Sequence, residues 1–224
     1  MQAVAMLGGP PEEWPENTEE IFKEAKNNKQ LIFASDRGTV FLNRWGIIPD
    51  VAVGDFDSLK SDEKIILNKI VDVRYSQPIK DYTDSEQLFL TALREYQVSK
   101  LTVYGSTGGR LDHFFVNIFT FLKPELRNFL PKVELIDKQN ILKFYNSGQH
   151  KINYCKGYKY IGFGNLEKIV NFSILDARYE LKNFSCDYPT FFSSNEFVNE
   201  NSFWIKNEGG VVLAIYSKDI NRFG

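Results

Sequence analysis

The stretch Val51-Ala52-Val53-Gly54-Asp55-Phe56-Asp57-Ser58 places a short apolar run directly before a glycine and two carboxylates. The run is typical of a buried strand, and the residues from Gly54 onward are typical of the loop that ends it. Four further strand-like runs alternate with helical patterns, at residues 31–34, 71–75, 101–104 and 133–136. Repeated strand–helix alternation predicts an α/β fold with a largely parallel sheet.

The pattern changes after about Asp137, where helical periodicity fades. Short runs rich in Tyr, Phe, Ile and Val follow, at residues 159–163, 168–172, 202–206 and 210–216. The turn sequence Asn207-Glu208-Gly209-Gly210 predicts a β-hairpin between the last two runs. We therefore expect a Rossmann-like α/β domain over residues 1–137 and an all-β sandwich or barrel over residues 138–224.

Composition describes an ordinary globular chain and excludes several classes of protein. The 224 residues carry 27 Lys+Arg against 29 Asp+Glu, and 43% are apolar, which argues against a disordered chain and against a basic nucleic-acid-binding surface. No stretch approaches the roughly 20 apolar residues of a membrane span, and residues 1–7 lack the basic leader of a secretory signal. Cys155 and Cys186 form no metal-binding or disulfide pattern, which favours a reducing cytoplasm.

Aspartates follow four of the predicted strands. They are Asp36, Asp55, Asp57, Asp81, Asp84 and Asp112. The carboxyl ends of parallel strands share one edge of a sheet, where ligands bind in open α/β folds, so we expect these side chains to gather there. Crowded carboxylates repel one another unless a cation lies among them. Mg²⁺ suits such oxygen ligands and is usually held by one or two carboxylates plus substrate phosphates.

A glycine-rich turn, Gly105-Ser106-Thr107-Gly108-Gly109, precedes Arg110 and a predicted helix. Backbone N–H groups at such a helix start favour a phosphate, and an arginine can clamp it with two hydrogen bonds. Acids for a metal together with glycines and Arg110 for phosphate indicate phosphoryl transfer from a nucleotide. The chain has no P-loop string. Plainer interpretations stay open for single residues: a turn for Asp36, a helix cap for Asp84 and packing for His113.

Four strings, taken in order, resemble the thiamine pyrophosphokinases. They are Ser35-Asp36-Arg37-Gly38, Pro49 to Ser58, Lys80-Asp81-Tyr82-Thr83-Asp84, and Gly105 to His113. A fifth string, Ser193-Ser194-Asn195-Glu196, lies where the family has a Ser-Asn pair. The resemblance spans almost the whole chain. It implies an N-terminal domain that binds ATP and Mg²⁺, a C-terminal domain that helps hold thiamine, and a homodimer with active sites at the subunit interface.

The resemblance also assigns roles to residues. Metal and pyrophosphate contacts fall on Asp55, Asp57, Asp84 and Asp112, which with Arg110 form the catalytic set. Nucleotide contacts fall on Asp36, Arg37, Gly38, Lys80, Asp81, Thr107, Gly108, Gly109, Arg110 and His113. Thiamine contacts fall on Tyr179, Ser194 and Asn195, presented to the partner's active site.

Two positions depart from the family pattern. Many relatives have Asp-Gly-Gly where this chain has Asp36-Arg37-Gly38. Arginine does not adopt positive φ as readily as glycine, so either the turn differs or Arg37 itself reaches phosphate. Many relatives carry a tryptophan at the position that Tyr179 occupies. In this chain the smaller tyrosine ring would have to make the aromatic contact to thiamine.

The reaction implied is ATP plus thiamine giving AMP plus thiamine diphosphate. The thiamine hydroxyl would attack the β-phosphorus, with charge neutralised by Mg²⁺ and Arg110 and the proton accepted by a carboxylate such as Asp112. Three alternatives remain: a pyrophosphokinase for another heterocyclic alcohol such as a pterin, a non-catalytic thiamine- or nucleotide-binding protein, and a metal-dependent phosphohydrolase.

Overall fold

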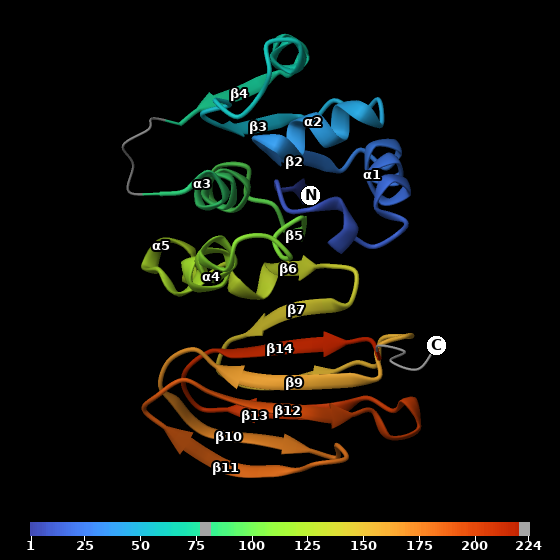
Figure 1. Cartoon of the computed structure of the whole chain (residues 1–224). Coiled ribbons are helices and arrows are strands. Elements are labelled where there is room, and N and C mark those ends of the chain that lie inside the picture. The colour runs from blue at the N-terminus through green and yellow to red at the C-terminus, as the bar shows by residue number, and fades with distance from the viewer. Residues whose placement is uncertain (77–81, 220–224) are drawn as a thin grey trace. The chain divides into compact units, whose positions relative to one another are not determined.

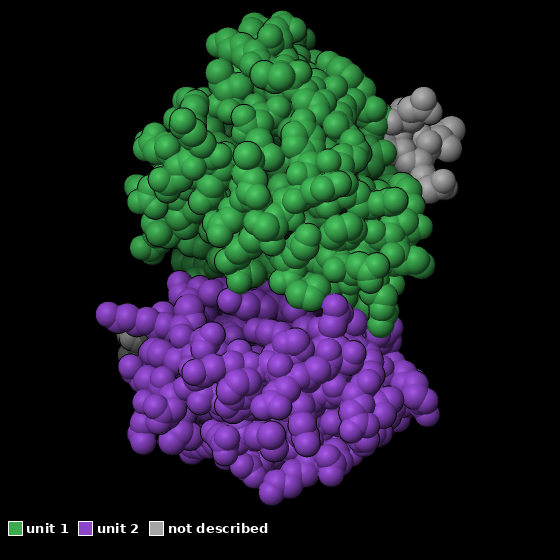
Figure 2. Space-filling model, turned by 180° about the vertical axis from the view of Figure 1, so that it is seen from behind, with its two compact units in different colours: residues 1–138 green, residues 139–224 purple. Residues whose placement is uncertain are grey.

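A computed structural model describes residues 1–76 and 82–219. Lys80 and Asp81, to which the sequence assigned nucleotide contacts, lie outside the described residues. The chain divides into two compact units, Met1–Lys138 and Gln139–Gly224 (Figure 2). The second unit consists of strands, with one short 3₁₀ turn, whereas the first alternates strands and helices (Figure 1).

The strands of unit 1 are all parallel and follow the order β4-β3-β2-β1-β5-β6. Their bounds are β1 (Gln2–Met6), β2 (Leu31–Ser35), β3 (Val51–Gly54), β4 (Asp72–Tyr75), β5 (Lys100–Tyr104) and β6 (Val133–Ile136). The sequence predicted the last five, so the α/β expectation is confirmed. Strand β1 was not predicted, although it is central. The chain runs outward from β1 to β4 and then returns to β5, so the strand order reverses between β1 and β5.

Five α-helices lie between these strands in the part of the chain that the structure describes. They are α1 (Thr18–Asn27), α2 (Arg37–Arg44), α3 (Asp84–Leu90), α4 (Leu111–Phe119) and α5 (Pro124–Arg127). Helix α3 begins with a capping box, in which the Thr83 hydroxyl accepts from the Glu86 N–H and the Glu86 carboxylate accepts from the Thr83 N–H. The segment between β3 and β4 is the 3₁₀ helix η2 (Glu63–Lys69). Among the described residues, no helix is long and apolar enough to cross a membrane.

Helix α2 packs closely on the central strand. A Cβ atom added to Gly38 would lie 2.1 Å from the backbone oxygen of Met6. Since a carbon atom cannot approach an oxygen so closely, only glycine fits between this helix and β1. Gly38, which the sequence analysis placed in a nucleotide site, therefore has a packing role in the first turn of α2.

Unit 2 contains two sets of antiparallel strands. One has the neighbours β12-β9-β14-β7 and the other β11-β10-β13-β8. The bounds are β7 (Asn140–Tyr145), β8 (Gly148–Ile152), β9 (Tyr160–Asn165), β10 (Ile169–Leu175), β11 (Leu181–Cys186), β12 (Thr190–Glu196), β13 (Phe203–Asn207) and β14 (Val212–Ser217). Phe163 of β9 contacts Phe172 and Phe203 of the other set, with ring centroids 6.2 and 5.9 Å apart. The two sets pack as a sandwich, which confirms the all-β expectation.

The hairpin predicted at residues 207–210 is wrong. Strand β13 pairs with β10 and β8, whereas β14 pairs with β7 and β9, so this turn carries the chain from one sheet to the other. The buried Asn207 side chain donates from Nδ2 to the carbonyls of Gly209 and Gly210, at 3.2 and 3.0 Å. Turn residues specify a change of direction, but the partner of each strand depends on packing far along the chain.

Candidate active site

A cavity of about 660 Å³ lies in unit 1 among the loops that follow β1, β2 and β5 and the first residues of α3. These loops leave the carboxyl ends of parallel strands, on both sides of the point where the strand order reverses. Open α/β sheets bind ligands at this switch point. The cavity is therefore the candidate active site of the described residues.

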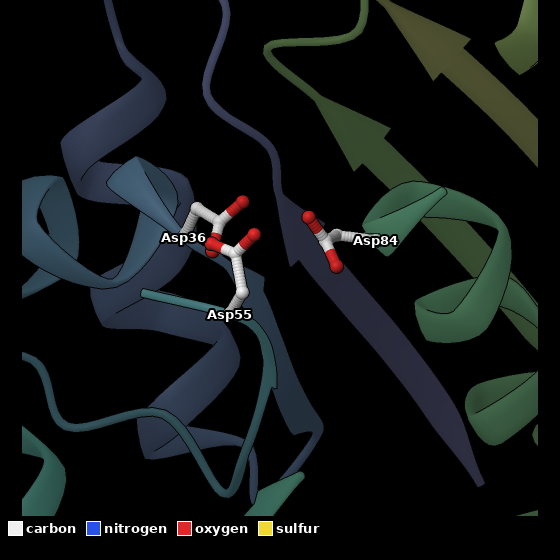
Figure 3. A group of neighbouring side chains, drawn as sticks. All are labelled: Asp36, Asp55 and Asp84. Atoms are coloured by element: carbon white, nitrogen blue, oxygen red, sulfur yellow. The ribbon is translucent and has the colours of Figure 1, made fainter. Parts of the chain in front are cut away.

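Three aspartates converge at this cavity (Figure 3). Asp36 lies between β2 and α2, Asp55 follows β3, and Asp84 is the first residue of α3. One carboxylate oxygen of each lies within 4.8 Å of those of the other two. The structure thus brings together three of the aspartates that the sequence placed at one sheet edge.

Asp36 is held in place by an unusual backbone and a close neighbour. Its φ is +38°, its N–H donates to the Val53 carbonyl at 3.2 Å, and its Oδ1 accepts from the Phe56 N–H at 3.2 Å. A Cβ on Gly54 would lie 2.0 Å from this Oδ1. A side chain at position 54 would therefore displace the Asp36 carboxylate, which occupies that space.

Burial, above all, raises the pKa of Asp36 to about 7, and the charge of Asp84, the hydrogen bond with it and the charge of Asp55 raise it further. The Ser76 hydroxyl donates to Asp84 Oδ1 at 2.5 Å. Three carboxylates in such proximity favour either a retained proton or a bound cation. Their hard oxygen atoms are the ligands that Mg²⁺ prefers, so the donor set fits this ion.

The raised pKa predicts that stability falls as the pH increases. Asp36 has a usual pKa of 3.8 and a folded pKa of about 7, so between these values the native state binds more protons than the unfolded chain. The free energy of unfolding therefore decreases across this window and levels off above it. We expect the melting temperature in EDTA to decline from about pH 4 to pH 7 through this group.

Asp36→Asn is the matched comparison, since it keeps the shape and removes the titration. The melting temperature of this variant relative to that of wild type should rise with increasing pH, because only the wild type loses stability through this group. MgCl₂ should reduce the difference. A difference that is constant from pH 4 to pH 8 would contradict the raised pKa.

Asp57 and Asp112 do not line the cavity. Asp57 is exposed, and its N–H donates to Asp55 Oδ1 at 3.1 Å. Asp112 is exposed and pairs with Arg110 at 2.5 Å. The Arg110 guanidinium lowers the pKa of Asp112, which makes this carboxylate a weaker proton acceptor while the pair persists. Their metal-binding roles rest on the resemblance alone.

The glycine-rich turn after β5 lies against the loop after β1. The Gly9 N–H donates to the Gly105 carbonyl at 2.9 Å, and a Cβ on Gly9 would lie 2.5 Å from that oxygen. The Thr107 hydroxyl donates to Asp137 at 3.0 Å, which fixes the turn from the end of β6. Thr107, Gly109, Arg110 and His113 line the cavity. Gly108 adopts φ +79° beside Glu13.

Arg37 departs from the family pattern without strain. It is the first residue of α2, and the positive φ belongs to Asp36 instead. Arg37 lines the cavity, and its guanidinium donates to Glu63 at 2.8 Å. The turn therefore accommodates arginine through the positive φ of Asp36, and the phosphate contact of Arg37 stays a prediction.

The cavity also contains residues to which the sequence assigned no contact, namely Leu7, Gly8, Gly9, Pro10, Ser58, Tyr82, Thr83, Ser85, Glu86, Ser106 and Asn117. The buried Asn117 of α4 donates from Nδ2 to the Ser106 carbonyl at 3.1 Å and so ties the helix to the glycine-rich turn. Gly8-Gly9 directly after a short apolar run was the available signal. It is the same pattern that identified the turn after β5.

The three residues assigned to thiamine lie in unit 2. Tyr179 is in the connection from β10 to β11, and the residue is 55% exposed. Ser194 and Asn195 belong to β12, where Ser194 is exposed at φ +63° and Asn195 is buried. Of the Ser-Asn pair, Ser194 thus faces solvent and Asn195 faces the protein interior.

Both units of the chain match models of known protein domains. Residues 22–132 match the model of the thiamin pyrophosphokinase catalytic domain, and residues 149–212 match that of the thiamin pyrophosphokinase vitamin B1 binding domain. A thiamine pyrophosphokinase of Bacillus subtilis is 34% identical over 187 residues, covering 82% of this chain and 86% of the relative.

Solved structures show the same similarity. A thiamin pyrophosphokinase family protein from Enterococcus faecalis superposes with a TM-score of 0.88 at 27% identity, over 98% of this chain and 100% of that one. The thiamin pyrophosphokinase of Geobacillus thermodenitrificans gives 0.82 at 28% identity, over 99% of each chain. Matches to both domain models, a curated relative and full-length structures agree with the strings that the sequence carries, and this chain belongs to the thiamin pyrophosphokinase family.

Proposed function

We propose that the chain transfers the pyrophosphoryl group of ATP to the hydroxyl of thiamine, giving AMP and thiamine diphosphate. The observation that carries this proposal is the convergence of Asp36, Asp55 and Asp84 at a cavity bordered by two glycine loops. In this proposal residues 1–137 form the ATP- and Mg²⁺-binding catalytic domain, and residues 138–224 form the thiamine-binding domain.

Asp36, Asp55 and Asp84 would hold Mg²⁺. The family resemblance adds Asp57 and Asp112 as further metal and pyrophosphate contacts. The metal, when bound, supplies positive charge that neutralises phosphate oxygens. The protein's own part is to keep three carboxylates converged despite their repulsion. It does so through the Asp36 turn, the hydrogen bond from Ser76 to Asp84, and the capping box that anchors the start of α3.

The glycine-rich turn and Arg110 would bind the pyrophosphoryl group, with Thr107, Gly108, Gly109 and His113 beside it. Lys80 and Asp81 remain proposed contacts by resemblance. When ATP binds, the Arg110 guanidinium would leave its ion pair with Asp112 and bind phosphate oxygens instead. Because the pKa of Asp112 is lowered by Arg110, that exchange would raise it toward its usual value and allow Asp112 to accept the hydroxyl proton.

Thiamine would be held by the β domain of a second copy of the chain, through Tyr179 and the Ser194-Asn195 segment. An exposed apolar face on α4 supports a homodimer. Leu111, Phe115 and Phe119 are 72, 52 and 44% exposed, and the two phenylalanine rings stack 5.9 Å apart. A molar mass in solution of twice the 25.9 kDa chain would support this assembly. The free Cys155 and Cys186 support action in a reducing cytoplasm.

The product of the reaction tests the proposal directly. The full chain is incubated with ATP and MgCl₂, with and without thiamine, and nucleotides are separated by chromatography. We expect AMP only when thiamine is present, in equal amount to thiamine diphosphate. ADP or free phosphate as the sole product would contradict pyrophosphoryl transfer. AMP formed with a pterin alcohol but not with thiamine would assign the same chemistry to another acceptor.

A further inference from the structure

The Asn195 side chain is buried and makes hydrogen bonds within the protein. The residue is 4% exposed. Its Oδ1 accepts hydrogen bonds from the N–H groups of Tyr179 and Glu196, at 3.1 and 2.9 Å, and its Nδ2 donates to the Tyr179 carbonyl at 2.8 Å. Both polar atoms of the carboxamide therefore bond to backbone groups, and two of the three bonds go to one residue.

A bulge in β12 explains why Asn195 faces inward. Phe192 lies opposite Phe163 of β9 and Asn195 opposite Ile161, so three steps along β12 match two along β9. The extra residue is accommodated where Ser194 adopts φ +63°. A single inserted residue reverses the alternation of side chains. The Ser194 side chain is consequently exposed and that of Asn195 is buried.

The bonds of Asn195 join the two sheets of unit 2. Tyr179 lies between β10 and β11 in one sheet, whereas β12 belongs to the other. The Arg178 guanidinium lies 5.5 Å from the centroid of the Tyr179 ring and pairs with Glu196 at 2.5 Å. One segment of β12 thus fixes both the backbone of Tyr179 and the cation beside its ring.

We propose that Asn195 is a positioning residue that holds the exposed Tyr179 ring for thiamine and makes no contact with thiamine itself. The inference rests on the proposed function, in which Tyr179 contacts the substrate. A cationic thiazolium is attracted to an aromatic face. A ring that is already fixed loses little conformational freedom when the substrate binds. Loss of the bonds should therefore weaken thiamine binding without changing the chemistry.

Asn195→Ala should raise the KM for thiamine about 10-fold, the scale of one aromatic contact. The KM for ATP and the kcat at saturating thiamine should change less than about two-fold. In a Tyr179→Ala background, Asn195→Ala should add no further increase in the KM for thiamine, because the ring that it positions is absent. Tyr179→Phe, which keeps the ring, should retain the wild-type value.

Asn195→Asp distinguishes positioning from direct contact and serves if the alanine variant does not fold. Its carboxylate retains the two accepted bonds but cannot donate to the Tyr179 carbonyl, so the KM for thiamine should lie between those of wild type and Asn195→Ala. A residue that touches the cationic thiazolium would bind it better as a carboxylate. A lower KM for this variant than for wild type would overturn the proposal.

Asn165 provides a matched control within the same unit. It is also 4% exposed, and its Nδ2 donates to the carbonyl of another exposed tyrosine, Tyr188, at 2.8 Å. Asn165→Ala should leave the KM for thiamine near the wild-type value. An equal rise in both alanine variants, or full additivity with Tyr179→Ala, would overturn the positioning role. A wild-type chain that forms no AMP with thiamine would instead overturn the proposed function and, with it, this inference.

Discussion

Replacing Asp55 by asparagine should lower kcat/KM for AMP formation by at least about 100-fold, or about 2.7 kcal/mol of transition-state stabilisation. The substitution removes one of the three carboxylates whose oxygens lie within 4.8 Å of one another. Asparagine keeps the size of the side chain and loses the negative charge that a divalent cation needs. Turnover at saturating ATP, thiamine and MgCl₂ measures the effect.

The same variant should be at least as stable as wild type in EDTA. Asp55 contributes to the repulsion that raises the pKa of Asp36, so removing its charge relieves an unfavourable interaction in the metal-free protein. A higher melting temperature together with lost turnover would separate a functional defect from misfolding. Asp62→Asn is the matched control, because Asp62 is exposed and lies outside the cavity. Near-wild-type turnover in Asp55→Asn would refute the metal-binding proposal.

Replacing Gly38 by alanine should destabilise the protein by about 3 kcal/mol, which corresponds to a decrease of roughly 6–12 °C in melting temperature for a chain of this size. The added Cβ would lie 2.1 Å from the Met6 backbone oxygen. The obstacle is backbone of the central strand, so no side-chain rotation can relieve the clash. Helix α2 must move away from β1 instead.

Gly8→Ala is the control for this substitution. A Cβ on Gly8 meets its nearest neighbour, the Arg37 Cβ, at 3.4 Å, which is ordinary contact. Its melting temperature should stay close to that of wild type, since alanine at a compatible backbone position changes stability by less than about 1 kcal/mol. Equal melting temperatures for the two variants would contradict the close packing of α2 on β1.

The sequence allowed prediction of most of unit 1, since runs such as residues 31–34 and 101–104 are mostly apolar, end in turn residues and precede a helix. It failed at β1, the strand Gln2–Met6. This short run, apolar from Ala3 to Met6, carries no alternation. Its central place follows from pairing with β2 and β5, which lie about 30 and 100 residues further along the chain. That pairing determines where the strand order reverses.

By itself the sequence determined the available chemistry. It placed aspartates after parallel strands, a glycine-rich turn before Arg110, and a Ser-Asn pair in the second half. The tertiary structure decided which of these groups meet. Asp36, Asp55 and Asp84 converge, whereas Asp57 and Asp112 lie outside the cavity, and Asn195 is buried beside the exposed Ser194. The direction of a side chain depends on local φ and on strand register. Contacts between residues far apart in the chain fix both, as at the Asp36 turn and the β12 bulge.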